Sequence, residues 1–367
     1  MDKIVKFIEC LVPVTICNLK CDYCYIIQEN RRKNQMPKFK YTPKQIREAL
    51  RKERLGGVAY ISICGAGETL VADEVIDIAK ELLEEGHYIN ITTNGTLNNK
   101  FDKIIEEIPQ ENLSKMHFAF SLHYLELKNK NLLDNFSRNI KLVRENGCSY
   151  TLQMNLYDKY TENITEIKNY CKRNFGFLPQ LAATRDETQK NNDGIRLYTK
   201  KSQKEYQDDG KSFNSELFDY TMKNFRKKRE EFCYAGDWSF LLDLATGEMR
   251  KCYCSRKKID IMKNPNKKIK FEAIGKNCES SYCINSSHFL SLGVIPELDK
   301  EPTYAQLRKR KDSYSQQMTQ ILNQKLYENN KEYKNLRKII INSKGKIYKE
   351  VRKCGRIIKR KFKKAEQ

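Results

Sequence analysis

The 367-residue sequence has little histidine, tryptophan and proline, with four, one and eight residues respectively. No stretch approaches the roughly 18 consecutive apolar residues that a membrane-spanning helix needs. The first ten residues include Lys3, Lys6 and Glu9, so they lack the apolar segment of a secretory signal peptide. We therefore expect a cytoplasmic chain, in which cysteines bind metals or take part in catalysis more often than they form disulfides.

Charge of both signs is abundant but unevenly distributed. The formal net charge is +22, from 69 Lys or Arg and 47 Asp or Glu. Residues 331–367 hold fifteen Lys or Arg and three Asp or Glu, so this segment contributes +12 and the first 330 residues contribute +10. A basic excess favours an anionic partner, such as a membrane surface, a phosphorylated substrate or nucleic acid.

The basic C-terminal segment has the periodicity of an amphipathic helix. One apolar residue recurs every three or four positions, at Ile347, Val351, Cys354, Ile358 and Phe362. Lysine and arginine occupy the other faces. Such a helix either lies on an anionic membrane, at its inner face, or packs its apolar stripe against the protein. RNA binding is a less favoured interpretation.

Hydrophobic periodicity in the first 185 residues predicts alternating strands and helices. Strands are expected at 7–16, 58–63, 88–92, 116–122, 149–156 and 177–182. Helices are expected at 42–54, 73–85, 97–108, 129–145 and 161–173. This alternation indicates a parallel sheet, and six strands are fewer than the eight of a closed barrel. The predicted fold is therefore α/β, a partial (βα)6 TIM-like barrel over residues 1–185.

The composition changes after the predicted barrel. Residues 186–232 are polar and are expected to form a linker or insertion. Residues 233–300 concentrate cysteine, glycine and tyrosine, and we expect a small cysteine-rich module there. Residues 301–367 are expected to form a basic helical C-terminal extension.

Three cysteines near the N-terminus form the most specific motif. Cys17, Cys21 and Cys24 have the spacing C-x3-C-x2-C, directly after the first expected strand. A structural zinc site takes four ligands, and none of the four histidines, at positions 87, 117, 123 and 288, lies close in sequence. A cubane iron–sulfur cluster also normally takes four cysteines. Three cysteines would leave one iron open to a substrate or cofactor, and zinc with a distant fourth ligand remains the alternative.

This motif, with Tyr23 before its last cysteine, resembles the cluster motif of the radical S-adenosylmethionine (radical SAM) enzymes. The resemblance implies that Cys17, Cys21 and Cys24 are catalytic and hold a [4Fe-4S] cluster whose open iron binds S-adenosyl-L-methionine. It further implies that a flavodoxin- or ferredoxin-type reductant drives cleavage to a 5′-deoxyadenosyl radical, which abstracts hydrogen from a substrate. The protein would then be an oxidoreductase.

Other residues resemble the positions at which this family binds S-adenosylmethionine. The Gly65–Glu68 stretch ends the second expected strand like the family's glycine-rich motif, with Ala66 in place of the middle glycine. The 92–96 stretch resembles its Thr-Asn-Gly-Thr turn, and Gln180 to Thr184 would lie near the adenine. The candidate cofactor-binding residues are Tyr23, Gly65, Ala66, Gly67, Glu68, Thr93, Asn94, Ser121 and Asn155.

A second group of cysteines follows an expected β-hairpin at 241–249, with Gly247 in its turn. The hairpin would bring Cys233 and Cys252 together. Their C-x13-G-x4-C spacing resembles the opening of SPASM and twitch modules, which append auxiliary clusters to radical SAM barrels. Five thiols fit one auxiliary [4Fe-4S] cluster of the twitch type better than two clusters. The candidate metal ligands are Cys233, Cys252, Cys254, Cys278 and Cys283.

Within that group, Cys254 is a spare thiol, a ligand in place of Cys278, or a hydrogen donor. A structural zinc knuckle is the alternative for the whole group. The five remaining cysteines are expected to be buried, inert thiols; they are Cys10, Cys64, Cys148, Cys171 and Cys354. His288 could cap a cluster, bind a phosphate or simply pack.

The substrate stays open at this point. A ribosomal peptide is the class that the SPASM and twitch resemblance implies. The basic tail favours a sugar or glycan intermediate, and the net charge leaves an RNA-modifying enzyme as an alternative. A scaffold without enzymatic activity, in which both cysteine groups bind zinc, is the interpretation from a different class.

Overall fold

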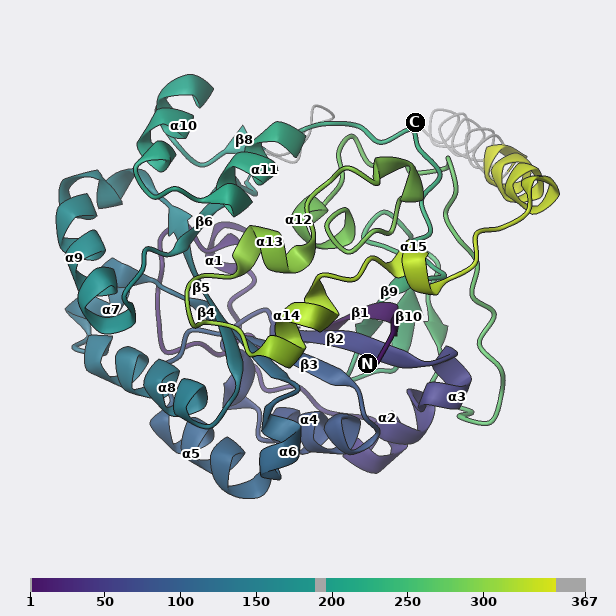
Figure 1. Cartoon of the computed structure of the whole chain (residues 1–367), viewed down its shortest axis with the longest axis horizontal. Coiled ribbons are helices and arrows are strands. Elements are labelled where there is room, and N and C mark those ends of the chain that lie inside the picture. Colours follow the sequence, from purple (N-terminus) through teal and green to yellow (C-terminus); the bar gives the residue numbers. More distant parts are fainter. Residues whose placement is uncertain (1, 189–195, 348–367) are drawn as a thin grey trace, which may run out of the picture.

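Six parallel strands form the centre of the protein in a computed structural model that describes residues 2–188 and 196–347 (Figure 1). Each strand is hydrogen-bonded to the next one along the chain. The strands are β1 (Ile4–Val12), β2 (Val58–Gly65), β3 (Tyr88–Thr93), β4 (Met116–Ser121), β5 (Ser149–Leu156) and β6 (Gln180–Ala183). The predicted partial barrel is thereby confirmed.

Helices cover the outer face of these strands (Figure 1). The main ones are α2 (Pro43–Ala49), α4 (Glu74–Glu84), α5 (Asn98–Glu107), α8 (Leu133–Glu145) and α9 (Ile164–Phe175). Helix α2 begins where the sequence predicts it, because Thr42 and Gln45 form a reciprocal capping box and Pro43 occupies the first turn. Helix α4 buries a continuous apolar face that includes Val75, Ile76 and Leu82.

Two predicted helices are interrupted. The helix expected at 42–54 breaks after Ala49 and resumes as α3 (Lys52–Leu55). The helix expected at 129–145 is replaced by α7 (Tyr124–Asn129) and α8, with Asn131 between them at a φ of 53°. A single left-handed residue ends a helix even where the hydrophobic periodicity continues. Short helical segments fill other connections: α1 (Tyr25–Gln28), η1 (Thr69–Val71), α6 (Gln110–Leu113) and η2 (Asp158–Asn163).

The sheet continues on the other side of β1 with strands from much later in the sequence. Strand β9 (Ser239–Asp243) runs parallel to β1, with Phe7 opposite Ser239 and Leu11 opposite Asp243. β10 (Glu248–Arg250) pairs antiparallel with β9, and β11 (Ile259–Asp260) follows it. Gly247 has a φ of 77° in the turn, so the predicted hairpin is present. The sheet order is β11-β10-β9-β1-β2-β3-β4-β5-β6, so the hairpin extends the barrel sheet itself.

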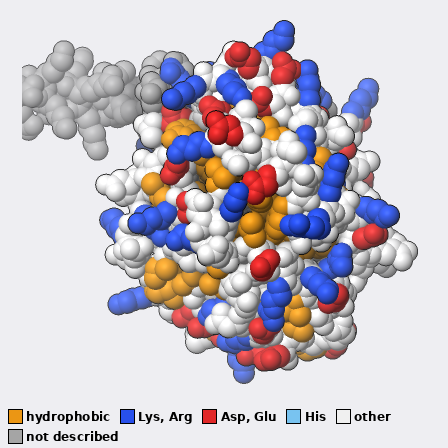
Figure 2. Space-filling view, turned by 90° about the vertical axis from the view of Figure 1, so that its left-hand side faces the viewer, with side chains coloured by type: hydrophobic (Ala, Val, Ile, Leu, Met, Phe, Trp, Pro, Cys, Tyr) orange, Lys and Arg blue, Asp and Glu red, His pale blue; other side chains and the backbone are white. Residues whose placement is uncertain are grey.

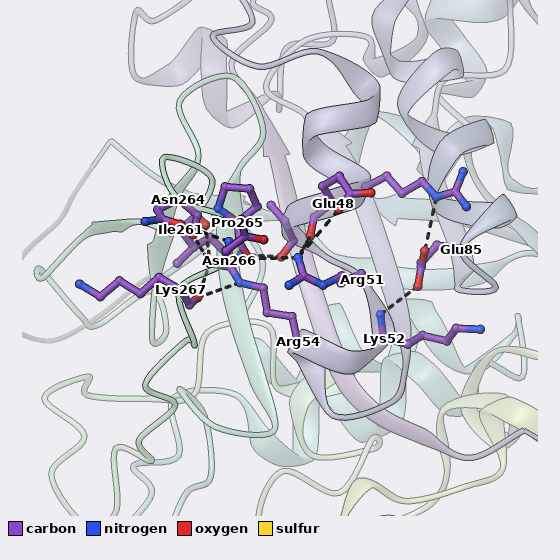
Figure 3. Close-up of polar contacts among 12 residues, drawn as sticks. Glu48, Arg51, Lys52, Arg54, Glu85, Ile261, Asn264, Pro265, Asn266 and Lys267 are labelled. Carbon is purple, nitrogen blue, oxygen red and sulfur yellow. Dashed lines mark hydrogen bonds and ion pairs between the residues drawn. The ribbon is translucent and has the colours of Figure 1, made fainter.

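Two arginines hold the loop after β11 against the barrel (Figure 3). Arg54 of α3 donates to the carbonyl oxygens of Ile261, Asn264 and Lys267, at 2.8 to 3.1 Å. Arg51 donates to the carbonyl oxygen of Pro265 at 3.0 Å. The cysteine-rich part of the chain is therefore tied to the first helices through backbone carbonyls.

The segment expected to be a linker or insertion contains regular structure. It holds a short hairpin of β7 (Arg185–Asp186) and β8 (Arg196–Leu197), followed by α10 (Gln203–Lys211) and α11 (Glu216–Asn224). Helix α11 packs against β6, and Gln180 and Ser215 are hydrogen-bonded at 2.8 Å. Gln180 and Thr184 are fully buried in this packing, so their side chains contact other residues of the protein.

The C-terminal extension is a series of short helices, where the sequence predicted one helical segment. Its helices are α13 (Tyr304–Arg308), α14 (Gln316–Leu322) and α15 (Leu326–Asn329), and residues 335–347 are also helical. Two more short helices, α12 (Ser286–Phe289) and η3 (Pro296–Leu298), precede the extension, within the cysteine-rich residues 233–300. Figure 1 shows α12 to α15 in front of the strands. Residues 348–367, with the last part of the predicted amphipathic helix and Cys354, lie outside the described residues.

These helices fill the barrel near the N-terminal ends of the strands. Tyr304 and Tyr314 pack against His117 of β4, and the Tyr314 hydroxyl is 2.8 Å from Thr151 Oγ1 of β5. His288 is half-buried between Phe7 and Tyr304, and its Nδ1 lies 3.3 Å from Arg308 Nη2. The C-terminal ends of the strands are left for a site.

The surface of the described part mixes charges of both signs. On the face in Figure 2, basic and acidic side chains are interspersed around apolar patches. Among the described residues, no helix is both long enough and apolar enough to cross a membrane.

Candidate active site

The carboxyl ends of β1 to β5 meet at one cavity of about 230 Å³. Its lining brings together every candidate from the first cysteine motif and the strand ends. These are Cys17, Cys21, Tyr23, Cys24, Gly65, Ala66, Gly67, Glu68, Thr93, Asn94, Ser121 and Asn155. Parallel strands place their C-terminal ends at the same edge, which is why residues so far apart in sequence meet here.

The glycine-rich turn is shaped by the backbone that precedes the cysteine loop. The N–H groups of Gly67 and Glu68 donate to the carbonyl oxygens of Val14 and Ile16, at 2.6 and 2.8 Å. A Cβ on Gly67 would lie 2.1 Å from the Ile16 carbonyl oxygen. This close approach by the protein's own chain requires glycine at position 67, so the cysteine loop and the turn are fixed to each other.

Asparagines connect the cysteine loop to the end of β3. Asn94 Nδ2 donates to Asn18 Oδ1 at 2.8 Å and lies 3.7 Å from Cys17 Sγ. Asn18 Nδ2 in turn donates to Thr96 Oγ1 at 2.8 Å. Asn94 thus contacts a candidate ligand directly, and a hydrogen bond to a ligand sulfur orients that ligand.

The Glu68 side chain accepts hydrogen bonds from the turn at the end of β3. This side chain is 2% exposed, and its two oxygens accept from Thr93 Oγ1, the Asn94 N–H and the Leu70 N–H, at 2.6 to 3.1 Å. Burial raises the pKa of Glu68, and these three hydrogen bonds oppose that rise. The carboxylate therefore positions the β3 turn at the cavity wall.

Tyr23 is anchored by polar groups in the segments that follow β4 and β5. Its hydroxyl is hydrogen-bonded to His123 Nδ1 at 2.7 Å and to the Tyr160 hydroxyl at 2.9 Å. Burial lowers the pKa of His123 to about 4, so this imidazole is neutral at pH 7. His123 lines the cavity two residues after Ser121, and no motif in the sequence indicated it as a site residue.

Arg32 is a second residue that sequence reasoning missed. Its guanidinium donates to the carbonyl oxygens of Leu19, at 2.7 Å, and Cys17. It also lines the cavity, and its charge lowers the pKa of Cys17 against the larger effect of burial, which raises it. Arg32 therefore holds the two ends of the segment from Cys17 to Leu19.

Comparison with known proteins identifies the barrel. Residues 11–171 match the family model of the radical SAM superfamily. These residues form a radical SAM domain. No curated protein sequence matches the chain.

Among solved structures, the radical SAM domain and its extension are similar to several proteins. Streptococcus suis SuiB bound to S-adenosylmethionine is 17% identical with a TM-score of 0.48, over 72% of this chain and 64% of SuiB. The anSMEcpe structure with bound AdoMet is 16% identical with a TM-score of 0.47, over 88% of this chain and 91% of that one. BtrN in complex with AdoMet and 2-DOIA is 14% identical with a TM-score of 0.34, over 72% and 84%. The chain thus spans less than two thirds of SuiB.

A radical SAM domain implies a [4Fe-4S] cluster and S-adenosylmethionine, and the residues of this cavity fit both. Three thiols from one short loop converge on it, and polar groups from β3, β4 and β5 line the rest. Burial raises the pKa values of the Cys17 and Cys21 thiols. Buried thiolates of this kind are stable only beside a strong positive charge, which iron supplies.

The second cysteine group converges on a separate small cavity of about 30 Å³. Cys233, Cys252, Cys278 and Cys283 line it. Cys254 lies outside the lining but is hydrogen-bonded to Cys252 and Cys278. Burial raises the pKa of Cys233 to about 12. All five thiols therefore gather in one place, and Cys233, Cys252, Cys278 and Cys283 are the better placed set of four.

Among the other described cysteines, the expected burial is found for three of the four. Cys10, Cys148 and Cys171 are buried free thiols, and Cys64 is partly buried. Burial raises the pKa of Cys148 and of Cys171 to about 12, so both stay protonated at neutral pH.

A buried carboxyl group lies beside the second cysteine group. Glu9 of β1 accepts from the Tyr253 hydroxyl at 2.7 Å and from Asn285 Nδ2 at 2.9 Å. Tyr253 stands between Cys252 and Cys254 in sequence and lines the second cavity. Glu9 thus links the first strand of the barrel to the second cysteine group.

Proposed function

We propose that this protein is a radical SAM enzyme with one auxiliary [4Fe-4S] cluster, and that it modifies a ribosomal peptide. The observation that carries the proposal is the convergence of Cys17, Cys21 and Cys24 with the polar ends of β3, β4 and β5 on one cavity. When bound there, the cluster and S-adenosylmethionine supply a one-electron cleavage that leads to hydrogen abstraction from the substrate.

The chain's own residues hold this arrangement. Arg32 and the glycine-rich turn fix the cysteine loop, and Asn94 orients Cys17. Ser121 and Asn155, at the ends of β4 and β5, are suited to hydrogen-bond the nucleoside and carboxylate groups of S-adenosylmethionine. Tyr23, held by His123 and Tyr160, forms an apolar wall with a fixed hydroxyl.

The auxiliary cluster would be held by Cys233, Cys252, Cys278 and Cys283, with Cys254 as a neighbouring thiol. Four cysteine ligands complete a [4Fe-4S] cluster and leave no open iron. Such a cluster is suited to receive an electron from the substrate. Cys254 contacts Cys252 and Cys278 and is the replacement ligand if either is lost.

The proposed peptide substrate follows the SPASM and twitch resemblance of the second cysteine group. SuiB is also described bound to the precursor peptide SuiA, and anSMEcpe with the Cp18Cys peptide. A sugar or glycan intermediate is the second candidate, favoured by the basic C-terminal segment. Incubation with peptides encoded beside the gene, or with nucleotide sugars, followed by mass spectrometry, separates the two. A mass change confined to the sugar would refute the peptide assignment.

Iron content tests the cluster assignment. Anaerobically purified protein should hold about eight iron atoms per chain, and the Cys17→Ala/Cys21→Ala/Cys24→Ala variant about four. The intact protein with a reductant should release 5′-deoxyadenosine, and the triple variant should not. Cys148→Ala, which removes a buried thiol outside both groups, is the matched control and should keep all the iron. Stoichiometric zinc in place of iron would establish the scaffold interpretation.

We also propose that the C-terminal helix binds an anionic membrane. Residues 335–347 contact the body through Ile341, which is 6% exposed, and Asn342, which accepts from the Lys276 N–H at 3.0 Å. The opposite side is apolar and open: Leu336, Ile340 and Ile347 are 70%, 44% and 64% exposed. Figure 1 shows this helix at the edge of the molecule, away from the sheet.

The sequence continues that exposed face. Leu336, Ile340 and Ile347 are four and seven positions apart, which at 3.6 residues per turn places them on one face with the stripe predicted through Phe362, and the intervening positions are rich in lysine and arginine. An apolar face that points away from the body favours the membrane over packing on the protein. Sedimentation with vesicles containing phosphatidylserine tests this. Leu336→Gln/Ile340→Gln/Ile347→Gln keeps the charge and should abolish sedimentation at 0.15 M salt; unchanged sedimentation would refute membrane binding through this face.

A further inference from the structure

Arg229 is a buried arginine beside the second cysteine group. Its side chain is 5% exposed, and it lines the same small cavity as Cys233, Cys252, Cys278 and Cys283. Only Nη1 has a partner, Glu231 Oε1 at 3.4 Å. Within residues 2–188 and 196–347, Nε and Nη2 have no hydrogen-bond partner.

An arginine in this state is costly for the protein. A buried guanidinium is always charged, and each buried N–H group without a partner adds a desolvation penalty. Native proteins rarely keep such groups unless a ligand satisfies them. Because the unpaired nitrogens belong to a side chain that shares a cavity with four thiols, the missing partner is an anion that those thiols hold.

The chemistry of that partner follows from the thiols. Four thiolates around a [4Fe-4S] core give a net charge of two minus when oxidised and three minus when reduced. A guanidinium therefore interacts more strongly with the reduced form. Hydrogen bonds and charges near the sulfur atoms are among the properties by which a protein sets the reduction potential of a cluster.

We propose that Arg229 donates its Nε and Nη2 hydrogens to sulfur atoms of the auxiliary cluster, and that its charge stabilises the reduced form of that cluster. This rests on the proposed function, since it needs an iron–sulfur centre at Cys233, Cys252, Cys278 and Cys283. Arg229 thereby makes the auxiliary centre a better electron acceptor, while Glu231, on the same cavity, partly offsets its charge.

The experiment isolates the auxiliary centre in the full-length Cys17→Ala/Cys21→Ala/Cys24→Ala variant. Arg229→Gln, Arg229→Lys and, as a matched control, Lys228→Gln are added to it. Lys228 is the exposed neighbour of Arg229, and the substitution Lys228→Gln removes one positive charge without changing the cavity. Iron content and an anaerobic redox titration followed by electron paramagnetic resonance are measured for each.

Arg229→Gln should make the centre at least tenfold harder to reduce, which for a one-electron couple is a shift of about 59 mV to lower potential. Arg229→Lys should recover part of that shift, and Lys228→Gln should show none. A full iron content with an unchanged potential in Arg229→Gln would overturn the proposal. If Arg229→Gln holds no iron, the iron content of Arg229→Lys distinguishes the two explanations. Iron restored in Arg229→Lys supports a role for the positive charge. Iron lost from both variants shows a purely structural role for Arg229 and overturns the proposal.

Failure of the underlying function has a different signature. If the triple cysteine variant with Arg229 intact holds no iron, the auxiliary centre itself is absent. That result refutes the proposed function before any change at position 229 is made.

Discussion

The titration of Glu9 gives a direct test of how the barrel is built around the second cysteine group. The side chain is 6% exposed, and among the described residues its Oε2 atom has no hydrogen-bond partner. Burial raises its pKa from the ordinary 4.5 to about 7, and the hydrogen bonds from Tyr253 and Asn285 and the charge of Arg185 oppose part of that rise.

The sign of the effect on stability follows from the raised pKa. Between pH 4.5 and 7 the folded protein binds this proton more tightly than the unfolded chain, so stability falls as the pH rises through this window. Above pH 7, ionised Glu9 costs about 3 kcal/mol. Glu9→Gln keeps an acceptor for Tyr253 and removes the charge. It should stabilise the protein by about 3 kcal/mol at pH 8 and by less than about 1 kcal/mol at pH 5.

Thermal unfolding followed by circular dichroism measures this difference. An unfolding entropy of about 2.1 cal/mol/K per residue converts 3 kcal/mol into roughly 4 °C for a chain of this length. The Tm of Glu9→Gln should therefore exceed that of the wild type by about 4 °C at pH 8. Glu53→Gln, at an exposed position, is the control, and its Tm should differ from that of the wild type by the same amount at both pH values. An equal Tm difference between Glu9→Gln and the wild type at pH 5 and pH 8 would refute the reasoning.

Three further predictions concern the contacts that hold the cysteine loops. Gly67→Ala places a methyl group 2.1 Å from the Ile16 carbonyl oxygen, so iron should fall from about eight to about four atoms per chain, while Ala66→Gly should keep it. In Arg32→Lys, the single ammonium group cannot donate to the carbonyl oxygens of both Cys17 and Leu19, so iron should also fall to about four atoms per chain. The control Arg31→Lys should keep about eight, and iron retained in Arg32→Lys would contradict this role of the guanidinium. Arg54→Gln frees the loop shown in Figure 3, so amide exchange over 261–267 should quicken by at least tenfold, with Lys52→Gln unchanged. Equal protection in Arg54→Gln and the wild type would show that the loop is held elsewhere.

Local patterns were sufficient to predict the barrel. The 3.6- and 2-residue periodicities and the Thr42 cap are properties of neighbouring residues, and strand ends in a parallel sheet meet at one edge. The loop cysteines, Asn94, Ser121 and Asn155 were assigned to one site through their resemblance to the radical SAM motifs, and the shared edge of the parallel strands explains why they line one cavity.

Residues that act through distant neighbours could not be found in this way. Arg32, His123 and Glu9 are recognised by their partners, which lie between 13 and 276 positions away. The breaks in the C-terminal extension had a local signal, because Thr303 and Ser315 each cap a new helix. The pairing of β9 with β1 had none, since it joins segments separated by more than 200 residues.

That pairing sets the order in which the protein can be completed during synthesis. β1 emerges from the ribosome first, yet the strand that covers its outer edge, β9, ends only at Asp243. At roughly 5–20 residues per second, the edge of β1 stays without its partner for tens of seconds. An uncovered strand edge is a template for pairing with other chains. The nascent protein therefore passes through a stage in which a chaperone, or early incorporation of iron into the N-terminal loop, would decide between correct closure and aggregation.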